Sequence, residues 1–223
     1  MHQRKGKKIF IYFFLLLLVG SINNINLNNL KFGEIKNINV IGLEENEKLI
    51  FVKEIKNLDL KNIFQIKSEK IKNQINSNSL VEKFDIYKNY PSSLNINIKK
   101  TKFLARINKQ GKIYLVGSNG KFSKNEFLNN QLPFIFGKPE INEFLNFKKI
   151  IDKSQFSFDK IKNLYFFSSK RWDIEFKNGL IVKLPENDIP ATLSLVFEFL
   201  RNSDLKSIKI VDARIKSQII LND

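Results

Sequence analysis

The side chains that most often carry enzyme chemistry are nearly absent from this sequence. The 223 residues include no cysteine and a single histidine, His2, in a basic amino-terminal tail. A thiolate nucleophile, a Cys-ligated metal, a Ser-His-Asp triad and a histidine base in a folded domain are therefore excluded. No Gly-rich phosphate-binding string occurs either. We expect a protein that is not an enzyme and that carries no catalytic residue, metal or cofactor.

Two carboxylate pairs have structural explanations. Glu44 and Glu45 stand at the start of a predicted helix, where the helix dipole favours negative charge. Asp173 and Glu175 alternate along a predicted strand, so we expect them to face solvent. General acid–base catalysis needs a site that shifts pKa values, and the sequence indicates none. An exported hydrolase that uses only carboxylates is kept as a rival hypothesis.

The net charge of +16 has two explanations. One is a phosphate-bearing or other anionic partner. The other is A/T-rich codon usage, which the 33 Lys against only 5 Arg favour, because arginine is the better bidentate ligand of phosphate and bases. We therefore expect no nucleic-acid partner and no small-molecule substrate. A steep salt dependence of DNA binding would favour the first explanation.

The amino terminus combines four basic residues with the apolar run Ile9–Val19. The stretch from Ile9 to Ile22 spans about 21 Å as a helix, against about 30 Å of hydrocarbon, and an extension to Leu27 takes in three asparagines. A cleaved signal peptide with small residues at 19–21 is the alternative. We predict a cytoplasmic tail (1–8), a transmembrane anchor (9–27) and a linker (28–34), with the remainder exported.

Two domains are expected after the anchor. Residues 35–106 read as β-α-α-β-β, with helices at Glu44–Leu58 and from Ser68, and a turn at Asn89–Ser92. Residues 107–223 read as a mainly antiparallel β domain with helices. Its clearest hairpin alternates from Trp172 to Leu184 around an Asn-Gly type I′ turn. The fold class is therefore α+β.

The chain is predicted to close with extended structure over Ile208–Leu221. Ile215, Ser217, Ile219 and Leu221 would share one face of this strand, with Lys216, Gln218 and Ile220 on the other. A terminal strand at a sheet edge either receives a partner strand or is blunted by charge, and both readings stay open. On the preceding hairpin, Trp172 is expected in the core and Arg171 in contact with a partner.

Short strings along the chain resemble one bacterial cell-division family, FtsQ/DivIB, which joins a basic tail, an anchor, a POTRA domain and a β domain. These strings occupy Ile38–Gly42, Asn62–Ile66, Tyr90–Ile96, Tyr114–Val116 with Gly120, Leu132–Lys138, Arg171–Asp173, Asn178–Gly179, Lys183–Pro185 and Val211–Arg214.

The resemblance implies a single-pass protein of the inner membrane, with its bulk in the periplasm at the division septum. It implies a non-enzymatic divisome scaffold that bridges early and late division proteins and binds FtsB/FtsL-like partners through its β domain. The docking edge would comprise Arg171, Arg214, Ile215, Lys216, Ser217, Gln218, Ile219, Ile220 and Leu221. A POTRA-type chaperone or secretion-assembly component is the alternative function.

Overall fold

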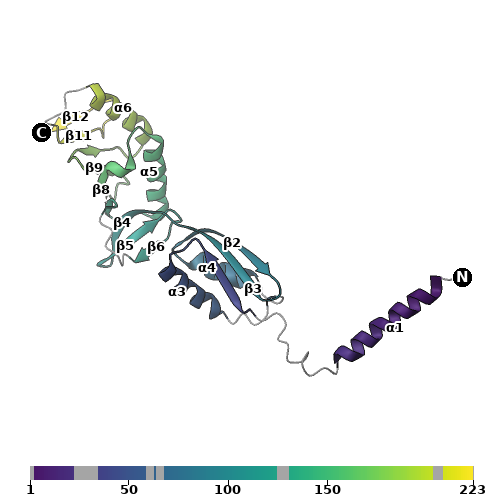
Figure 1. Ribbon diagram of the computed structural model, residues 1–223. Coiled ribbons are helices and arrows are strands. Elements are labelled where there is room, and N and C mark those ends of the chain that lie inside the picture. The colour runs from purple at the N-terminus through teal and green to yellow at the C-terminus, as the bar shows by residue number, and fades with distance from the viewer. Residues whose placement is uncertain are drawn as a thin grey trace. The chain divides into compact units, whose positions relative to one another are not determined.

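The computed structural model describes residues 3–22, 35–58, 63, 68–124, 131–202 and 208–222 (Figure 1). The chain divides into two units, one formed by residues 1–75 and 84–98 and the other by residues 76–83 and 99–223. The predicted linker at 28–34 and most of the Asn62–Ile66 string lie outside the described residues.

The amino-terminal helix α1 spans Gln3–Ile22. Every side chain from Ile9 to Val19 is exposed, by 44–74%. No helix in the described part of the chain is both long enough and apolar enough to cross a membrane. The predicted transmembrane anchor at 9–27 is therefore not confirmed, and residues 23–27 lie outside the described ranges.

The first unit follows the predicted β-α-α-β-β order. Its elements are β1 (Asn37–Ile41), α3 (Glu45–Lys56), α4 (Ser68–Ser77), β2 (Val81–Asn89) and β3 (Ser93–Lys100). The sheet order is β1-β3-β2, with β1 parallel to β3. As predicted, Glu44 and Glu45 begin a helix, where the Glu47 carboxylate accepts the Glu44 N–H at 3.1 Å.

The second unit contains a nine-stranded sheet of order β12-β11-β10-β9-β8-β7-β4-β5-β6. Its strands are β4 (Phe103–Lys109), β5 (Lys112–Gly117), β6 (Phe122–Lys124), β7 (Phe134–Phe136), β8 (Ile161–Phe166), β9 (Trp172–Phe176), β10 (Ile181–Lys183), β11 (Ile210–Asp212) and β12 (Ile220–Asn222). Antiparallel pairs predominate, but β4–β7, β7–β8 and β10–β11 are parallel. The class is α+β, and the predicted domain boundary at 106/107 falls inside β4.

Two helices cover one face of this sheet, α5 (Ile141–Lys153) and α6 (Ile189–Asn202) (Figure 1). A short 3-10 helix, η1 (Phe158–Lys160), precedes β8. Phe147 of α5 stacks on Trp172 with ring centroids 4.6 Å apart, and Trp172 is 3% exposed. The predicted core position of Trp172 is thus confirmed, and its neighbours in the strand, Asp173 and Glu175, lie on the face away from the helices.

Two local predictions were wrong. The end of the chain is not one strand, because β11 and β12 form an antiparallel hairpin through a turn at residues 215–217. The Asn178-Gly179 turn is not type I′, since only Gly179 has a positive φ, of 89°. Phe176 N–H instead bonds Leu180 O at 2.8 Å around a three-residue loop, a common longer hairpin connection with glycine in the left-handed position.

Candidate partner-binding site

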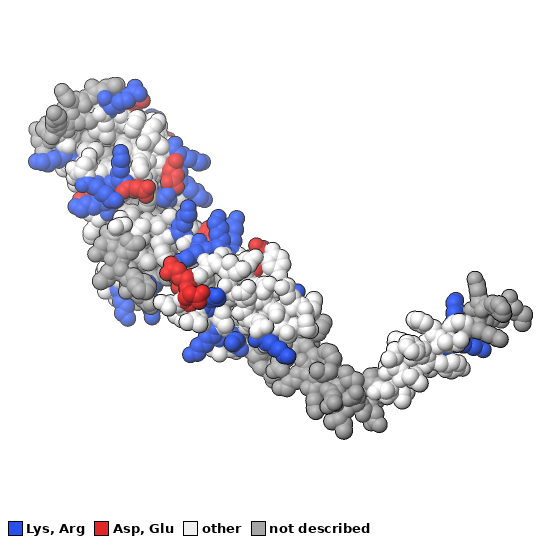
Figure 2. All heavy atoms as spheres, in the orientation of Figure 1, with Lys and Arg blue, Asp and Glu red and all other residues white. Residues whose placement is uncertain are grey.

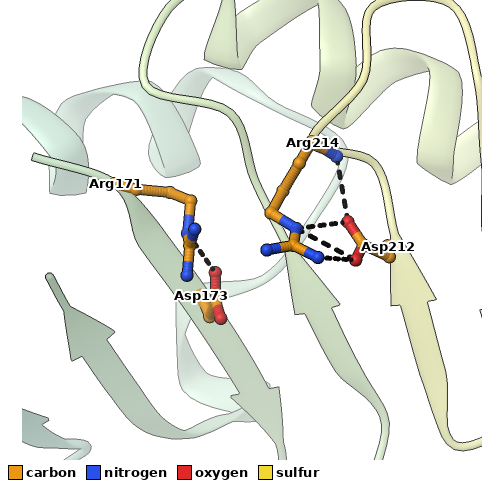
Figure 3. A network of polar contacts seen from close by, with 4 residues as sticks. All are labelled: Arg171, Asp173, Asp212 and Arg214. Carbon is orange, nitrogen blue, oxygen red and sulfur yellow. Dashed lines mark hydrogen bonds and ion pairs between the residues drawn. The ribbon is translucent and has the colours of Figure 1, made fainter. Parts of the chain in front are cut away.

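Three motif segments that are separate in the sequence form adjacent strands. In the register of the sheet, Asp173 of β9 lies opposite Lys183 of β10, and Lys183 lies beside Asp212 of β11. Because side chains alternate between the faces of a sheet, these three charged residues share the helix-free face. Arg171 lies beside Asp173, and the guanidinium of Arg214 lies between Asp173 and Asp212 (Figure 3). We call these five residues the charged ladder.

Asp173 and Asp212 are the buried members of the charged ladder, and Asp173 is the more buried of the two, at 5% exposure of the whole residue. Burial raises the pKa of its carboxyl, while Arg171, Lys183, the backbone of Leu184 and Arg214 oppose that rise. A buried carboxylate is costly unless cations and hydrogen-bond donors surround it. The two arginines and the lysine therefore supply positive charge that offsets the burial of Asp173.

Arg171 stands at the start of β9 after a tight turn. Its Nε lies 3.4 Å from Asp173 Oδ1, and its guanidinium lies 4.3 Å from the centre of the Phe167 ring. Neither Arg171 Nε nor Asp173 Oδ1 makes a hydrogen bond within the described part of the chain. The side chain of Arg171 is 23% exposed. It therefore contacts Asp173 and Phe167 while its Nε–H still lacks a hydrogen-bond acceptor among the described residues.

Arg214 is fixed by Asp212 just after β11. Its Nε donates to both carboxylate oxygens at 2.8 and 2.9 Å, its Nη2 donates to Oδ2, and its backbone N–H donates to Oδ1 at 3.2 Å (Figure 3). These bonds lower the pKa of Asp212, with burial opposing them and Lys183 assisting. The Arg214 side chain remains 44% exposed, so a preoriented cation is presented to solvent.

Glu175 lies on the same face, two residues along β9. Its carboxylate accepts hydrogen bonds from Lys162 Nζ at 2.8 Å, Asn163 Nδ2 at 2.8 Å and Tyr165 Oη at 2.6 Å. The bonds from Lys162 and Tyr165 lower its pKa from 4.5 to about 2. The expectation that Asp173 and Glu175 face open solvent was wrong, because neighbouring polar side chains cover them to 7% and 13% exposure.

The last strand, β12, leaves one edge open. It ends the strand order, and no described strand pairs with its outer side. Ala213 N–H donates to Lys183 O and Ile181 N–H to Lys209 O, so the odd-numbered residues of β11 bond toward β10. The even-numbered residues then bond toward β12, where Ile220 and Asn222 are their partners. By alternation, Leu221 directs its own N–H and C=O away from the sheet.

Only part of the predicted docking edge is strand. Ile215 to Ile219 form the connection before β12. Ser217 has a φ of 61°, and Gln218 N–H donates to Ile215 O at 3.1 Å inside this turn. Lys216 is 87% exposed and lies 3.8 Å from Asp188 Oδ2. Ile220 and Leu221 are in β12 with exposed apolar side chains, and Arg171 and Arg214 belong to the charged ladder.

Sequence reasoning missed Asp173, Lys183 and Asp212 as a group. Each falls in a string that carries the family resemblance, so the signal was present. Strand register decides which residues lie opposite one another across the sheet. The parallel strands β10 and β11 are separated in the sequence by α6. No local periodicity predicts that pairing.

Comparisons with known proteins point to one family. The family described as "Cell division protein FtsQ/DivIB, C-terminal" matches residues 105–214. A protein named "Cell division protein FtsQ" from Bradyrhizobium diazoefficiens is 21% identical over 160 residues, 69% of this chain and 46% of that protein. Proteins of the same name from Rhizobium radiobacter and Agrobacterium fabrum are each 25% identical over 126 residues, 52% of this chain and 56% and 37% of theirs.

The match thus spans about half the length of these curated relatives. Among solved structures, the major extracytoplasmic domain of DivIB from Geobacillus stearothermophilus is similar, with 12% identity and a TM-score of 0.33. That alignment covers 47% of this chain and 98% of the solved one. On this family match and the FtsQ relatives, residues 105–214 carry the C-terminal domain of the FtsQ/DivIB family of bacterial cell-division proteins.

Proposed function

We propose that this protein is a non-enzymatic divisome scaffold that bridges early and late division proteins at the septum. It binds an FtsB/FtsL-like bitopic partner by accepting a strand along the outer edge of β12. In this proposal residues 35–106 form a POTRA domain and residues 107–223 the β domain that docks the partner. The observation that carries the proposal is the open β12 edge beside the charged ladder, in a chain of a cell-division family.

Strand addition fits this edge in two ways. The outward N–H and C=O of Leu221 can exchange hydrogen bonds with a partner strand, each worth about 0.5–1.5 kcal/mol net. Ile220 and Leu221 are 47% and 41% exposed, so they offer apolar surface on both faces of the added strand. Because β12 is short, the exposed Arg214 guanidinium adds a charged contact that favours an acidic partner segment.

The proposal places the chain in the inner membrane with a cytoplasmic amino terminus and a periplasmic bulk. The exposed apolar side chains of α1 behind a basic tail support that placement. A phosphatase reporter that requires export should be active when fused after residue 222 and inactive when fused before residue 3. Carbonate extraction should leave the full chain in the membrane pellet, and release to the supernatant would contradict the anchor.

Two proline variants test the docking edge. Leu221→Pro removes an outward N–H, and proline is tolerated on an open strand edge, so the fold should survive while partner binding falls. Ile220→Pro is the matched control, because it deletes an N–H that bonds β11 and should destabilise the β11–β12 hairpin itself. Gln218→Pro does not test the edge, since its N–H is used inside the turn.

Binding is measured by pull-down and interferometry of the full chain with the purified FtsB-like protein of the same organism. Circular dichroism and the emission of Trp172 report the fold. A Leu221→Pro variant that folds and binds the partner as tightly as the parent would overturn strand addition at β12. In dividing cells, a fluorescent fusion should form a midcell band, whereas a uniform periplasmic signal would favour the chaperone alternative.

Side chains near the edge should matter less than the backbone. Lys216→Glu should slow association and cost under about 1 kcal/mol, because a charge that is 87% exposed is well screened. Arg171→Glu should weaken binding more, and it also places a second carboxylate beside Asp173. A double variant, Arg171→Gln with Asp173→Asn, separates these causes by removing both charges together.

A further inference from the structure

A second surface of the same unit lies at the opposite end of β9 from the charged ladder. Three hollows, of about 570, 650 and 520 Å³, share lining residues and so adjoin one another. The first and second share Phe156, Ser157 and Asp159, the second and third share Gln131 and Leu132, and Lys177 lines all three. We call this feature the Lys177 groove.

One end of the Lys177 groove is apolar. Phe156, Phe176, Leu180, Phe197 and Leu200 line the first hollow. The three aromatic rings are packed on one another, with centroids 5.4 Å apart for Phe156–Phe176 and 5.6 Å apart for Phe156–Phe197. The lining of this hollow is therefore mostly aromatic and aliphatic carbon, which suits an apolar side chain such as leucine.

Cations line all three hollows of the Lys177 groove. Its described lining residues include two acidic side chains, Asp152 and Asp159. They include seven basic ones: Lys102, Arg106, Lys148, Lys160, Lys162, Lys177 and Arg201. Three of these are bound to carboxylates, Lys148 to Asp152, Lys162 to Glu175 and Arg201 to Glu198. For Lys102, Lys160 and Lys177, no ion pair with a carboxylate occurs in the described ranges. Figure 2 shows the wider pattern, with more Lys and Arg than Asp and Glu on the visible surface.

We propose that the Lys177 groove binds an extended acidic peptide segment that inserts an aliphatic side chain into the hollow beside Leu200. Charge complementarity selects the acidic residues, because cations line each of the three adjoining hollows. The apolar end favours a peptide, because an aliphatic side chain can fill that hollow. Glycan and phosphate polymers have no such side chain. The site is independent of β12 and of the divisome proposal, so one can fail without the other.

The probe is a fluorescein-labelled peptide that carries Leu-Leu followed by four Asp-Ser repeats, titrated with the full chain in mild detergent. Replacing every Asp by Lys should abolish the anisotropy change, and replacing both Leu by Ser should weaken binding about tenfold. Lys177→Glu with Lys160→Glu should weaken binding by about tenfold or more. Lys112→Glu with Lys170→Glu makes the same charge change at exposed positions off the groove lining and should leave binding within about twofold.

Three results would overturn the proposal. One is equal weakening by the groove pair and the control pair, which would indicate a diffuse effect of net charge. Another is displacement of the peptide by hyaluronate or by single-stranded DNA at equal anion concentration, which would indicate a polyanion site instead. The third is loss of binding in Leu221→Pro, which would place the peptide at the strand edge. Leu200→Ala, checked for folding by Trp172 emission, should weaken the Leu-Leu probe and spare its Ser-Ser form.

Discussion

Changing Glu175 to Gln should remove most of the acid sensitivity that this residue gives the second unit. The carboxylate of Glu175 accepts hydrogen bonds from Lys162, Asn163 and Tyr165 at 2.6–2.8 Å, and its side chain is 13% exposed. Glutamine keeps the shape and one acceptor oxygen, but it loses the charge that Lys162 and Tyr165 stabilise. The substitution therefore isolates the ionised form.

The magnitude follows from the pKa of Glu175, which falls from 4.5 to about 2 in the folded chain. That change corresponds to about 3 kcal/mol of preference for the ionised carboxylate, and solvent screening on the helix-free face of the sheet reduces it to about 1–2 kcal/mol. A depressed carboxyl pKa stabilises the fold above the unfolded value and loses this contribution as pH falls. The loss should run from about pH 5 down to about pH 2.

The measurement is urea unfolding of the full chain followed by the emission of Trp172, the single tryptophan, which lies in the same strand as Glu175. Glu175→Gln should cost about 1–2 kcal/mol at pH 7 and much less at pH 3. Glu186→Gln, at an exposed position in the β10–α6 connection, is the matched control and should show no such trend. A Glu175→Gln cost that is the same at pH 7 and pH 3 would refute the reasoning.

Further predictions concern packing and backbone geometry. Gly137→Ala should destabilise the second unit by about 2–4 kcal/mol in urea unfolding, because a Cβ there would stand 2.2 Å from a backbone oxygen of β8 at a φ of 95°. Gly179→Ala, at a φ of 89° with open space around it, should cost only about 1 kcal/mol. If Gly137→Ala and Gly179→Ala destabilise the unit equally, the close approach of β8 to Gly137 does not matter. Asn119→Ala should cost about 1–3 kcal/mol, because its side-chain amide donates to Ser79 O and Val81 O at 2.9 Å. It should also speed amide exchange in residues 79–83, and unchanged exchange would contradict this. Phe147→Ala should cost about 3–5 kcal/mol and shift the emission of Trp172 to the red, and an unshifted spectrum would argue against the ring stack.

Local chemistry accounts for the parts of the fold that the sequence predicted well. The apolar alternation of Leu94, Ile96 and Ile98 placed β3, and all three side chains are buried. The helical spacing of Ile141, Phe144, Leu145 and Lys148 predicts a helix over Glu140–Lys153, and α5 forms there with Phe144 in the core. Such elements depend on residues that are close together in the sequence, so the spacing of their apolar residues is enough to predict them.

Predictions failed where a segment had two locally acceptable structures. Ile208–Leu221 has enough β-branched residues for one long strand, yet Ser217 turns the chain into a hairpin. The hairpin is favoured because it adds the backbone hydrogen bonds between β11 and β12. The alternation of side chains along the sequence does not reveal that pairing. The Asn178-Gly179 loop differs from type I′ for a similar reason, since the pairing of Phe176 with Leu180 decides its length.

The candidate site shows the same division most clearly. The sequence by itself determined the chemistry available, with cysteine absent, histidine confined to the tail, lysine in excess, and Arg171 and Arg214 inside strings typical of the family. Only the tertiary structure decided that Asp173, Lys183 and Asp212 stand side by side, and that Leu221 turns its backbone outward. The reason is that register across a sheet is fixed by burial of the whole helix-facing layer, from Trp172 to Val211, and not by the charged residues themselves.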